Sequence, residues 1–164
     1  GWTSQSLTDT IRHSYETANA GTPKLGWRSK AHDTPDASEW VMIDLGETFP
    51  LRQVVLHPTD LDTSNTLDPK SGNEIAAEGL HYDCAGFPLE LTVQGSDDGK
   101  SWKDFGKLAL KKSLPPGSGP QIVDLSSGAS CRYLRLLATR LGEVRASGKA
   151  CYRFQLVEVE ASAK

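Results

Sequence analysis

A short alternating run followed by a turn dipeptide constrains this chain more than any other feature. Residues 89–94 (LELTVQ) alternate strictly between apolar and polar side chains, which is the pattern of a strand with one buried face. Asp98-Gly99 follows shortly afterwards, and glycine tolerates the positive φ that a tight hairpin turn needs. The sequence therefore predicts a β-hairpin whose second strand runs through residues 102–110.

Further apolar or alternating runs predict strands along most of the chain. Residues 40–45 end at Gly46 and residues 53–57 end at Pro58, so residues that interrupt a strand ladder bound both runs. We expect both strands to be buried centrally in their sheets. In the last run the apolar phase changes between Leu156 and Val157, which indicates a bulge or burial on both faces. The remaining runs are residues 121–125, 132–138 and 154–161.

The strand count and the spacing between strands set the fold class. No window predicts a capped amphipathic helix, and at least seven short strands separated by turns rich in Gly and Pro predict an antiparallel sandwich or barrel. The 164 residues have the length of one domain. Residues 17–39, 58–88 and 139–152 are too long for simple turns, and long loops in compact domains commonly carry function.

Composition and motifs exclude several classes of function. The net charge of −3 removes the broad attraction that a nucleic-acid binder needs, and no apolar run approaches the roughly 20 residues that span a bilayer. The three cysteines lack metal-binding spacing, which leaves one disulfide and one free thiol as an alternative. Neither GxSxG nor HExxH is present, so a hydrolase would have to use paired carboxylates such as Asp33 and Asp60. The chain starts at Gly1 without a leader, as expected of a segment cut from a longer protein.

Four blocks of sequence carry a family resemblance. They are residues 26–29 (GWRS), 39–46 (EWVMIDLG), 87–102 (FPLELTVQGSDDGKSW), and 132–136 (RYLRL) with 154–159 (FQLVEV). In their order and spacing the chain resembles the discoidin family, also called coagulation factor five/eight type C domains, whose bacterial members are largely family 32 carbohydrate-binding modules. The resemblance implies an all-β fold, an antiparallel jelly-roll β-sandwich of about eight strands that is galactose-binding-domain-like, with residues 1–164 forming one binding domain.

The same resemblance implies a function. We expect a non-catalytic carbohydrate-binding module that targets a secreted glycoside hydrolase to a glycan through loops at one end of the sandwich. The alternative is a cell-surface or protein-adhesion module, because fold alone does not set function. The implied partners are a glycan and a covalently linked catalytic domain, in a secreted, periplasmic or cell-surface protein. Residues 58–88 hold six acidic residues and one lysine, a charge that anionic lipid headgroups would repel.

The family's sugar-binding positions map onto several residues near the amino terminus. Tyr15-Glu16-Thr17 is similar to the Gln-Glu-Thr stretch of sugar-binding relatives, so Glu16 is expected to accept hydrogen bonds from sugar hydroxyls unless it is a solvated loop carboxylate. Trp27 either stacks on the ligand or packs in the core. Arg28 replaces the His of those relatives and can donate a planar fork to hydroxyls or to a carboxylate, while Ala31 stands where they have a second aromatic residue.

The later loops supply the other expected ligand contacts. His57 and Asp60 stand near the position of an Arg in relatives; His57 can exchange hydrogen bonds with a hydroxyl or serve as a structural His, and Asp60 can bind ligand or cap a turn. Tyr82 is expected to stack on a sugar face. Arg145 is expected to contact the ligand, or alternatively to attract the acidic segment 58–88.

A calcium ion and a disulfide complete the expectations from the resemblance. Many relatives hold a structural calcium, but only Glu158 matches their motif here. Calcium would need a shifted cage of Asn19, Thr22 and backbone carbonyls, and no other cofactor is expected. The two later loops should share one end of the sandwich, which predicts a disulfide between Cys84 and Cys151 worth about 4 kcal/mol in the chain-entropy model.

Overall fold

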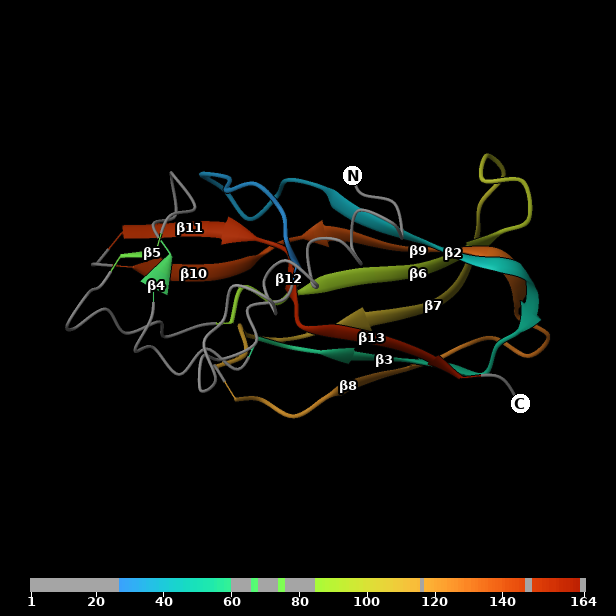
Figure 1. Cartoon of the computed structure of the whole chain (residues 1–164). Helices are drawn as coiled ribbons and strands as arrows, with labels where there is room; N and C mark the ends of the chain where they lie inside the picture. Colours follow the sequence, from blue (N-terminus) through green and yellow to red (C-terminus); the bar gives the residue numbers. More distant parts are fainter. Residues whose placement is uncertain are drawn as a thin grey trace.

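Two antiparallel β-sheets pack face to face and enclose the core (Figure 1). The computed structural model describes residues 27–59, 66–67, 74–75, 85–115, 117–146 and 149–162. Within these ranges every regular element is a strand, and no helix is long and apolar enough to cross a membrane. The architecture is the all-β sandwich that the strand pattern predicts.

One sheet has four strands in the order β2-β9-β6-β7. The alternating run becomes β6, and its buried Leu91 and Val93 face the core. The predicted hairpin is confirmed, because β6 and β7 pair antiparallel and Gly99 in their turn has a φ of 68°. The strand bounds are β2 (Glu39–Pro50), β9 (Ser130–Arg140), β6 (Glu90–Ser96) and β7 (Lys103–Ala109).

The facing sheet has three strands in the order β13-β3-β8. They are β13 (Glu158–Ser162), β3 (Gln53–His57) and β8 (Gln121–Asp124). Strand β3 occupies the predicted range and the predicted central position. Its Val54 and Leu56 are fully buried and pack against the inner face of the other sheet, in one cluster that also contains Val41, Leu134, Leu136 and Phe87.

Strand β2 departs from the prediction in two ways. It does not end at Gly46 but continues to Pro50, with a register shift against β9 between Asp44 and Phe49. Gly46 takes a φ of 87°, and its N–H donates to the Asp44 carboxylate at 2.8 Å. Glycine at this irregularity therefore bends the strand instead of ending it. The strand also lies at the edge of its sheet, not in the centre.

Residues 139–152 were expected to form a long loop, and this expectation was wrong. They contain the end of β9 and most of a second hairpin, β10 (Gly142–Ala146) with β11 (Lys149–Arg153). The alternation of Glu143, Val144 and Arg145 is a strand pattern, but it is too short and too charged to stand out. Val144 is buried and contacts Cys151 directly across the pair, which gives the hairpin one apolar face.

The change of apolar phase near the carboxyl terminus is a change of sheet partner. Gln155 and Leu156 form β12, which pairs with β1 (Trp27–Arg28), whereas β13 pairs with β3. Both residues of β12 are buried, in agreement with the predicted burial on both faces. A single run of chain thus ties the amino-terminal part of the described chain to the three-stranded sheet.

Candidate functional site

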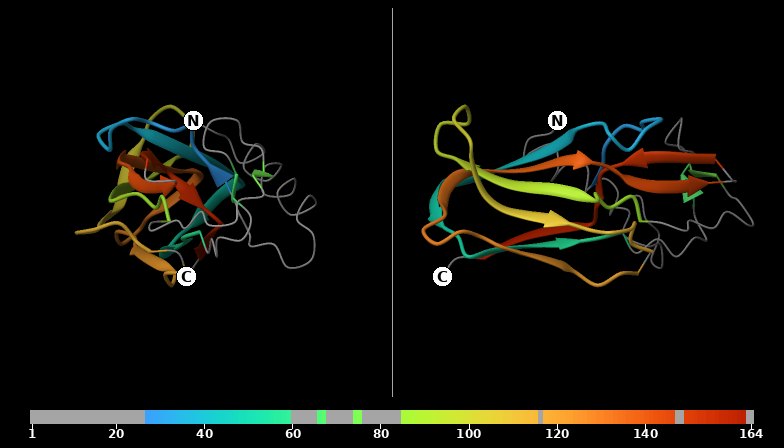
Figure 2. Two further views of the ribbon diagram at one scale, coloured as in Figure 1. Left: turned by 90° about the vertical axis from the view of Figure 1, so that its left-hand side faces the viewer. Right: turned by 180° about the vertical axis from the view of Figure 1, so that it is seen from behind.

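One end of the sandwich gathers the segments that the sequence singles out as functional. The β10–β11 hairpin projects beyond the two main sheets there, with the short pair β4 (Thr66–Leu67) and β5 (Glu74–Ile75) beside it in both Figure 1 and Figure 2. The opposite end carries the β6–β7 turn. The described pair β4–β5 of segment 58–88 therefore lies at the same end as the β10–β11 hairpin, as expected for these two segments.

Trp27 is a core residue at this end. Its side chain is fully buried, and it meets Phe154 edge to face with ring centroids 5.3 Å apart, a favourable aromatic geometry. The packing interpretation of Trp27 is confirmed. Its assignment as a ligand-stacking residue was wrong, because no face of the indole reaches solvent.

Residues 29–32 are fixed against β11 by backbone and side-chain hydrogen bonds. Ser29 N–H donates to the Phe154 carbonyl at 2.9 Å, and Phe154 N–H donates to Ser29 Oγ at 3.0 Å. The buried Arg153 donates from Nη1 to the Ser29 carbonyl at 3.3 Å. This segment therefore extends the hairpin as an ordered edge, and side chains on it are held in place.

Three polar or aromatic side chains stand in one row across this extension. His32 bridges Tyr152 through a reciprocal pair of backbone hydrogen bonds of 2.9 Å each, and Tyr152 is in turn paired with Glu143. Directly opposed residues in antiparallel strands project to the same face. All three are partly exposed, and the Tyr152 hydroxyl makes no hydrogen bond within the described ranges.

His32 is oriented by a buried carboxylate. Its Nε2 lies 2.7 Å from Oε1 of Glu39, whose side chain is only 10% exposed. A carboxylate only accepts hydrogen bonds, so Nε2 donates to Glu39, which leaves Nδ1 on the other side of the ring. The row therefore offers an aromatic ring, a hydroxyl and an imidazole side by side.

The other predicted contacts fall partly on this end and partly outside the described residues. Arg28 is partly exposed on β1, opposite the buried Gln155. Arg145 lies on β10 opposite Ala150, two residues along the strand from Glu143, which is the member of the row on that strand. Arg145 thus lies on the projecting hairpin, and Arg28 pairs with the strand that follows this hairpin in the chain. Glu16, Asp60 and Tyr82 lie outside the described residues, so their roles stay predictions.

His57 has a protein partner on the outer face of the three-stranded sheet. Its Nε2 is hydrogen bonded to Glu160 Oε1, and Glu158 is its direct cross-strand neighbour. Across the described ranges no three His, Cys, Asp or Glu side chains gather to hold a metal ion, so Glu158 has no described co-ligands for calcium. Asn19 and Thr22 lie outside those ranges.

Two of the three cysteines, Cys131 and Cys151, lie in described segments, and they form no disulfide with each other. Cys131 is fully buried, and this burial raises the pKa of its thiol to about 11. Cys151 is partly buried beside Val144. Cys84 lies outside the described residues, and the Cys84–Cys151 pairing stays a prediction.

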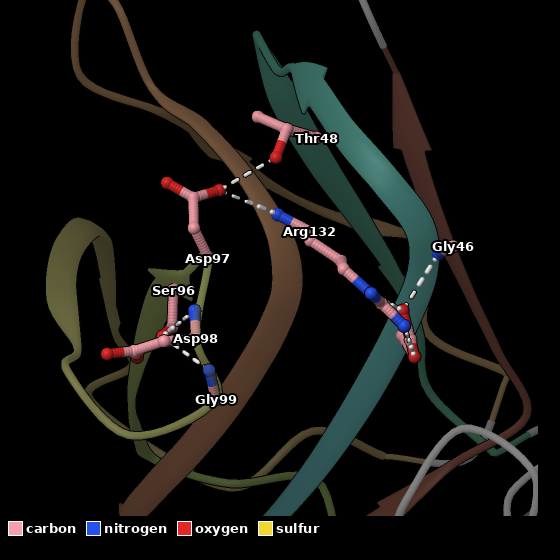
Figure 3. Close-up of polar contacts among 8 residues, drawn as sticks. Gly46, Thr48, Ser96, Asp97, Asp98, Gly99 and Arg132 are labelled. Atoms are coloured by element: carbon pink, nitrogen blue, oxygen red, sulfur yellow. Dashed lines mark hydrogen bonds and ion pairs between the residues drawn. The ribbon is translucent and has the colours of Figure 1, made fainter.

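The opposite end of the sandwich has a polar cluster whose contacts are structural (Figure 3). Arg132 donates from Nε and Nη2 to the two carboxylate oxygens of Asp44 at 2.9 and 3.0 Å, which lowers the pKa of Asp44. Asp97 accepts from Thr48 Oγ1 at 2.9 Å and from the Arg132 backbone N–H at 3.2 Å. These bonds join β2, β9 and the turn that follows β6, and they pair the charged groups within the protein.

Comparisons with known proteins agree on the fold. A solved family 32 carbohydrate-binding module from a family 31 glycoside hydrolase of Clostridium perfringens is similar with a TM-score of 0.58 and 14% identity, over 87% of this chain and 78% of that one. At this identity the similarity establishes the fold alone: the chain has the β-sandwich of a family 32 module. No protein-family model and no curated protein matches the sequence.

Two more distant structures are similar at lower scores. A Clostridium perfringens module in complex with GalNAc-β-1,3-galactose has a TM-score of 0.49 and 10% identity, over 78% of this chain and 68% of that one. The chitosan-binding module 1 of a chitosanase/glucanase from Paenibacillus sp. IK-5 has a TM-score of 0.47 and 13% identity, over 92% and 82%.

The row of His32, Tyr152 and Glu143 was not identified from the sequence. Its first and second members are 120 residues apart, and their contact depends on a single isolated bridge. One weak signal was available, since residues 143–152 hold an aromatic residue and three charged ones on the two sides of Gly148. Recognising that segment as a hairpin would have placed Glu143 opposite Tyr152.

Proposed function

We propose that this chain is a non-catalytic carbohydrate-binding module that binds a glycan at the end of the sandwich that bears β10 and β11. The observation that carries the proposal is the row of His32, Tyr152 and Glu143. Tyr152 packs partly against the core, and the exposed part of its ring presents an apolar surface to the C–H groups of a sugar. The flanking polar atoms give direction through hydrogen bonds to hydroxyls. The similarity of the fold to a solved carbohydrate-binding module supports this proposal.

The arrangement fits weak and reversible binding. The row lies on a projecting hairpin and its adjoining edge, so it contacts a limited part of a glycan, and binding must also offset the ordering of the ligand. Such a module works by raising the effective concentration of a linked partner near its substrate. We propose a glycoside hydrolase as that covalently linked partner, in a secreted, periplasmic or cell-surface protein.

A glycan array followed by calorimetry with the strongest neutral ligand tests the function, and both are run with and without calcium. Tyr152→Ala should weaken binding about tenfold, the effect of losing one aromatic contact with its hydrogen bond. Phe49→Ala is the matched control, because Phe49 is 37% exposed on β2 at the opposite end. That variant should bind like the unaltered protein.

Two outcomes would overturn these assignments. An array that is blank in both conditions contradicts glycan binding and favours the protein-adhesion alternative. If Tyr152→Ala binds the glycan with unchanged affinity, the glycan binds elsewhere on the protein and not at the row. His32→Ala tests the row a second time. Glu39 holds the imidazole of His32 in place, so loss of this imidazole should also weaken glycan binding.

A further inference from the structure

The outer face of the four-stranded sheet holds an arginine in an unusual setting. Arg135 lies on β9, between Met42 of β2 and Gln94 of β6 in one cross-strand row. The neighbouring row contains Trp40 and Leu137. All these residues are partly exposed, so the outer face combines planar polar groups with apolar side chains.

Arg135 is held rigidly by contacts that use only part of its guanidinium. Its central carbon lies 4.0 Å from the ring centroid of Trp102, a stacked cation–π arrangement. Its Nε donates to Gln94 Oε1 at 2.8 Å, and Gln94 Nε2 donates to Asp104 Oδ1 at 2.7 Å. The plane of the guanidinium is therefore fixed before any ligand arrives.

The outer edge of this guanidinium is open. Arg132 on the same strand uses Nε and Nη2 on the Asp44 carboxylate, whereas neither Nη atom of Arg135 has a hydrogen bond or a carboxylate partner among the described residues. Partial burial lowers the pKa of Arg135, with Asp104 opposing this effect. The group is thus a partly buried cation that forms no ion pair with a carboxylate of the described residues.

We propose that this face is a second binding surface, specific for an acidic saccharide whose carboxylate meets the two Nη atoms of Arg135. A guanidinium edge matches the geometry of a carboxylate and can donate two parallel hydrogen bonds to it. Trp40, Met42 and Leu137 beside it offer apolar contact for the sugar ring. The surface lies on a sheet face, separate from the row at the hairpin end, and it does not depend on that site.

The experiment is a titration of the isotopically labelled protein with tetragalacturonate, followed by two-dimensional NMR. We expect the Arg135 Nε–H and Trp102 indole N–H signals to shift with saturation. The fully methyl-esterified tetrasaccharide is the matched ligand, because it keeps the sugar chain and removes the charge. It should produce no such shifts at the same concentrations, and added salt should weaken binding of the acid form.

Three variants assign the binding to the guanidinium. Arg135→Gln should weaken binding of tetragalacturonate about tenfold or more, and Arg135→Lys should weaken it also, since Lys keeps the charge without the fork. Arg52→Gln loses the same charge from an exposed site next to β3 in the other sheet, and it should bind normally. Thermal melts establish that each variant is folded.

Several results would overturn the proposal. The first two are that tetragalacturonate does not bind or that its methyl ester binds equally well. The other two are that Arg135→Gln keeps its affinity or that Arg135→Gln and Arg52→Gln lose affinity equally. A preference for sulfated saccharides or acidic peptides over tetragalacturonate would also contradict it. Tyr152→Ala should leave this titration unchanged, so failure here and failure of the hairpin site can be told apart.

Discussion

At the scale of single residues, Gly142 shows how tightly the β10–β11 hairpin is joined to the sandwich. A Cβ at this position would lie 2.0 Å from the Phe87 carbonyl oxygen and 2.6 Å from the Gly86 carbonyl carbon. Backbone atoms cannot move aside as a flexible side chain can. Gly142 is therefore required by close approach and not by a special φ.

We predict that Gly142→Ala destabilises the protein by about 3 kcal/mol, the upper range for inserting a methyl group into a packed site. Urea unfolding monitored by circular dichroism gives this difference in the free energy of unfolding. Gly119→Ala is the control, since its added Cβ would meet nothing within 4 Å. Equal stabilities of the two variants would contradict the close packing.

A second prediction at this scale concerns Cys131. Burial raises the pKa of this thiol to about 11, so only about one molecule in a thousand carries the reactive thiolate at pH 8. Alkylation of the reduced, folded protein at pH 8 should leave Cys131 unlabelled, as read by peptide mass. Full labelling is expected only in denaturant. Rapid labelling of the folded protein would show that the β9 end opens readily.

At the scale of elements, the β6–β7 turn is stabilised by one carboxylate. Asp98 accepts hydrogen bonds from the backbone N–H groups of Ser101 at 2.7 Å and Lys100 at 2.8 Å, and from the hydroxyls of Ser96 and Ser101. The two backbone bonds are the main cause of its lowered pKa. The turn thus depends on the ionised form of Asp98.

This dependence predicts a specific pH profile. The folded-state pKa of Asp98 is below its unfolded value of about 4, so its stabilising contribution is fully present above pH 4 and is lost as the pH falls further. Asp98→Asn should lower the melting temperature by a few degrees at pH 7, and the difference should shrink below pH 4. Asp36→Asn, at an exposed position, should show neither effect.

Apolar or alternating runs of five or more residues predicted strands, and the sequence pattern failed where long-range pairing decides the structure. Residues 53–57 became β3 with the predicted bounds. The β10–β11 hairpin was missed because only Val144 and Cys151 give it an apolar face. The row at the candidate site depends on the bridge between His32 and Tyr152, which no local pattern encodes. Of the two interpretations of Trp27, packing in the core is the one that the structure shows, as is common for large aromatic residues.

At the scale of the whole molecule, the carboxyl-terminal run links the parts of the sandwich. In this run β11 forms the second strand of the projecting hairpin, β12 pairs with β1, and β13 completes the three-stranded sheet (Figure 1). Phe154 lies at the junction of these parts, fully buried against Trp27. The strand that carries Tyr152 of the candidate glycan site is therefore followed directly in the chain by a core residue, Phe154.

This position makes Phe154 a test of cooperativity. Phe154→Ala should cost about 4 kcal/mol, because it removes a buried ring and leaves a cavity. Tryptophan fluorescence reports on the surroundings of all four tryptophans, with Trp27 in direct contact with Phe154. Circular dichroism reports on the sheets, and both transitions should move together if the parts unfold as one unit. Ile122→Ala, at a side chain that is 57% exposed, should cost less than about 1 kcal/mol. Separate transitions in Phe154→Ala would instead show that the hairpin end unfolds apart from the sheets, and the glycan site would then be a locally stable unit.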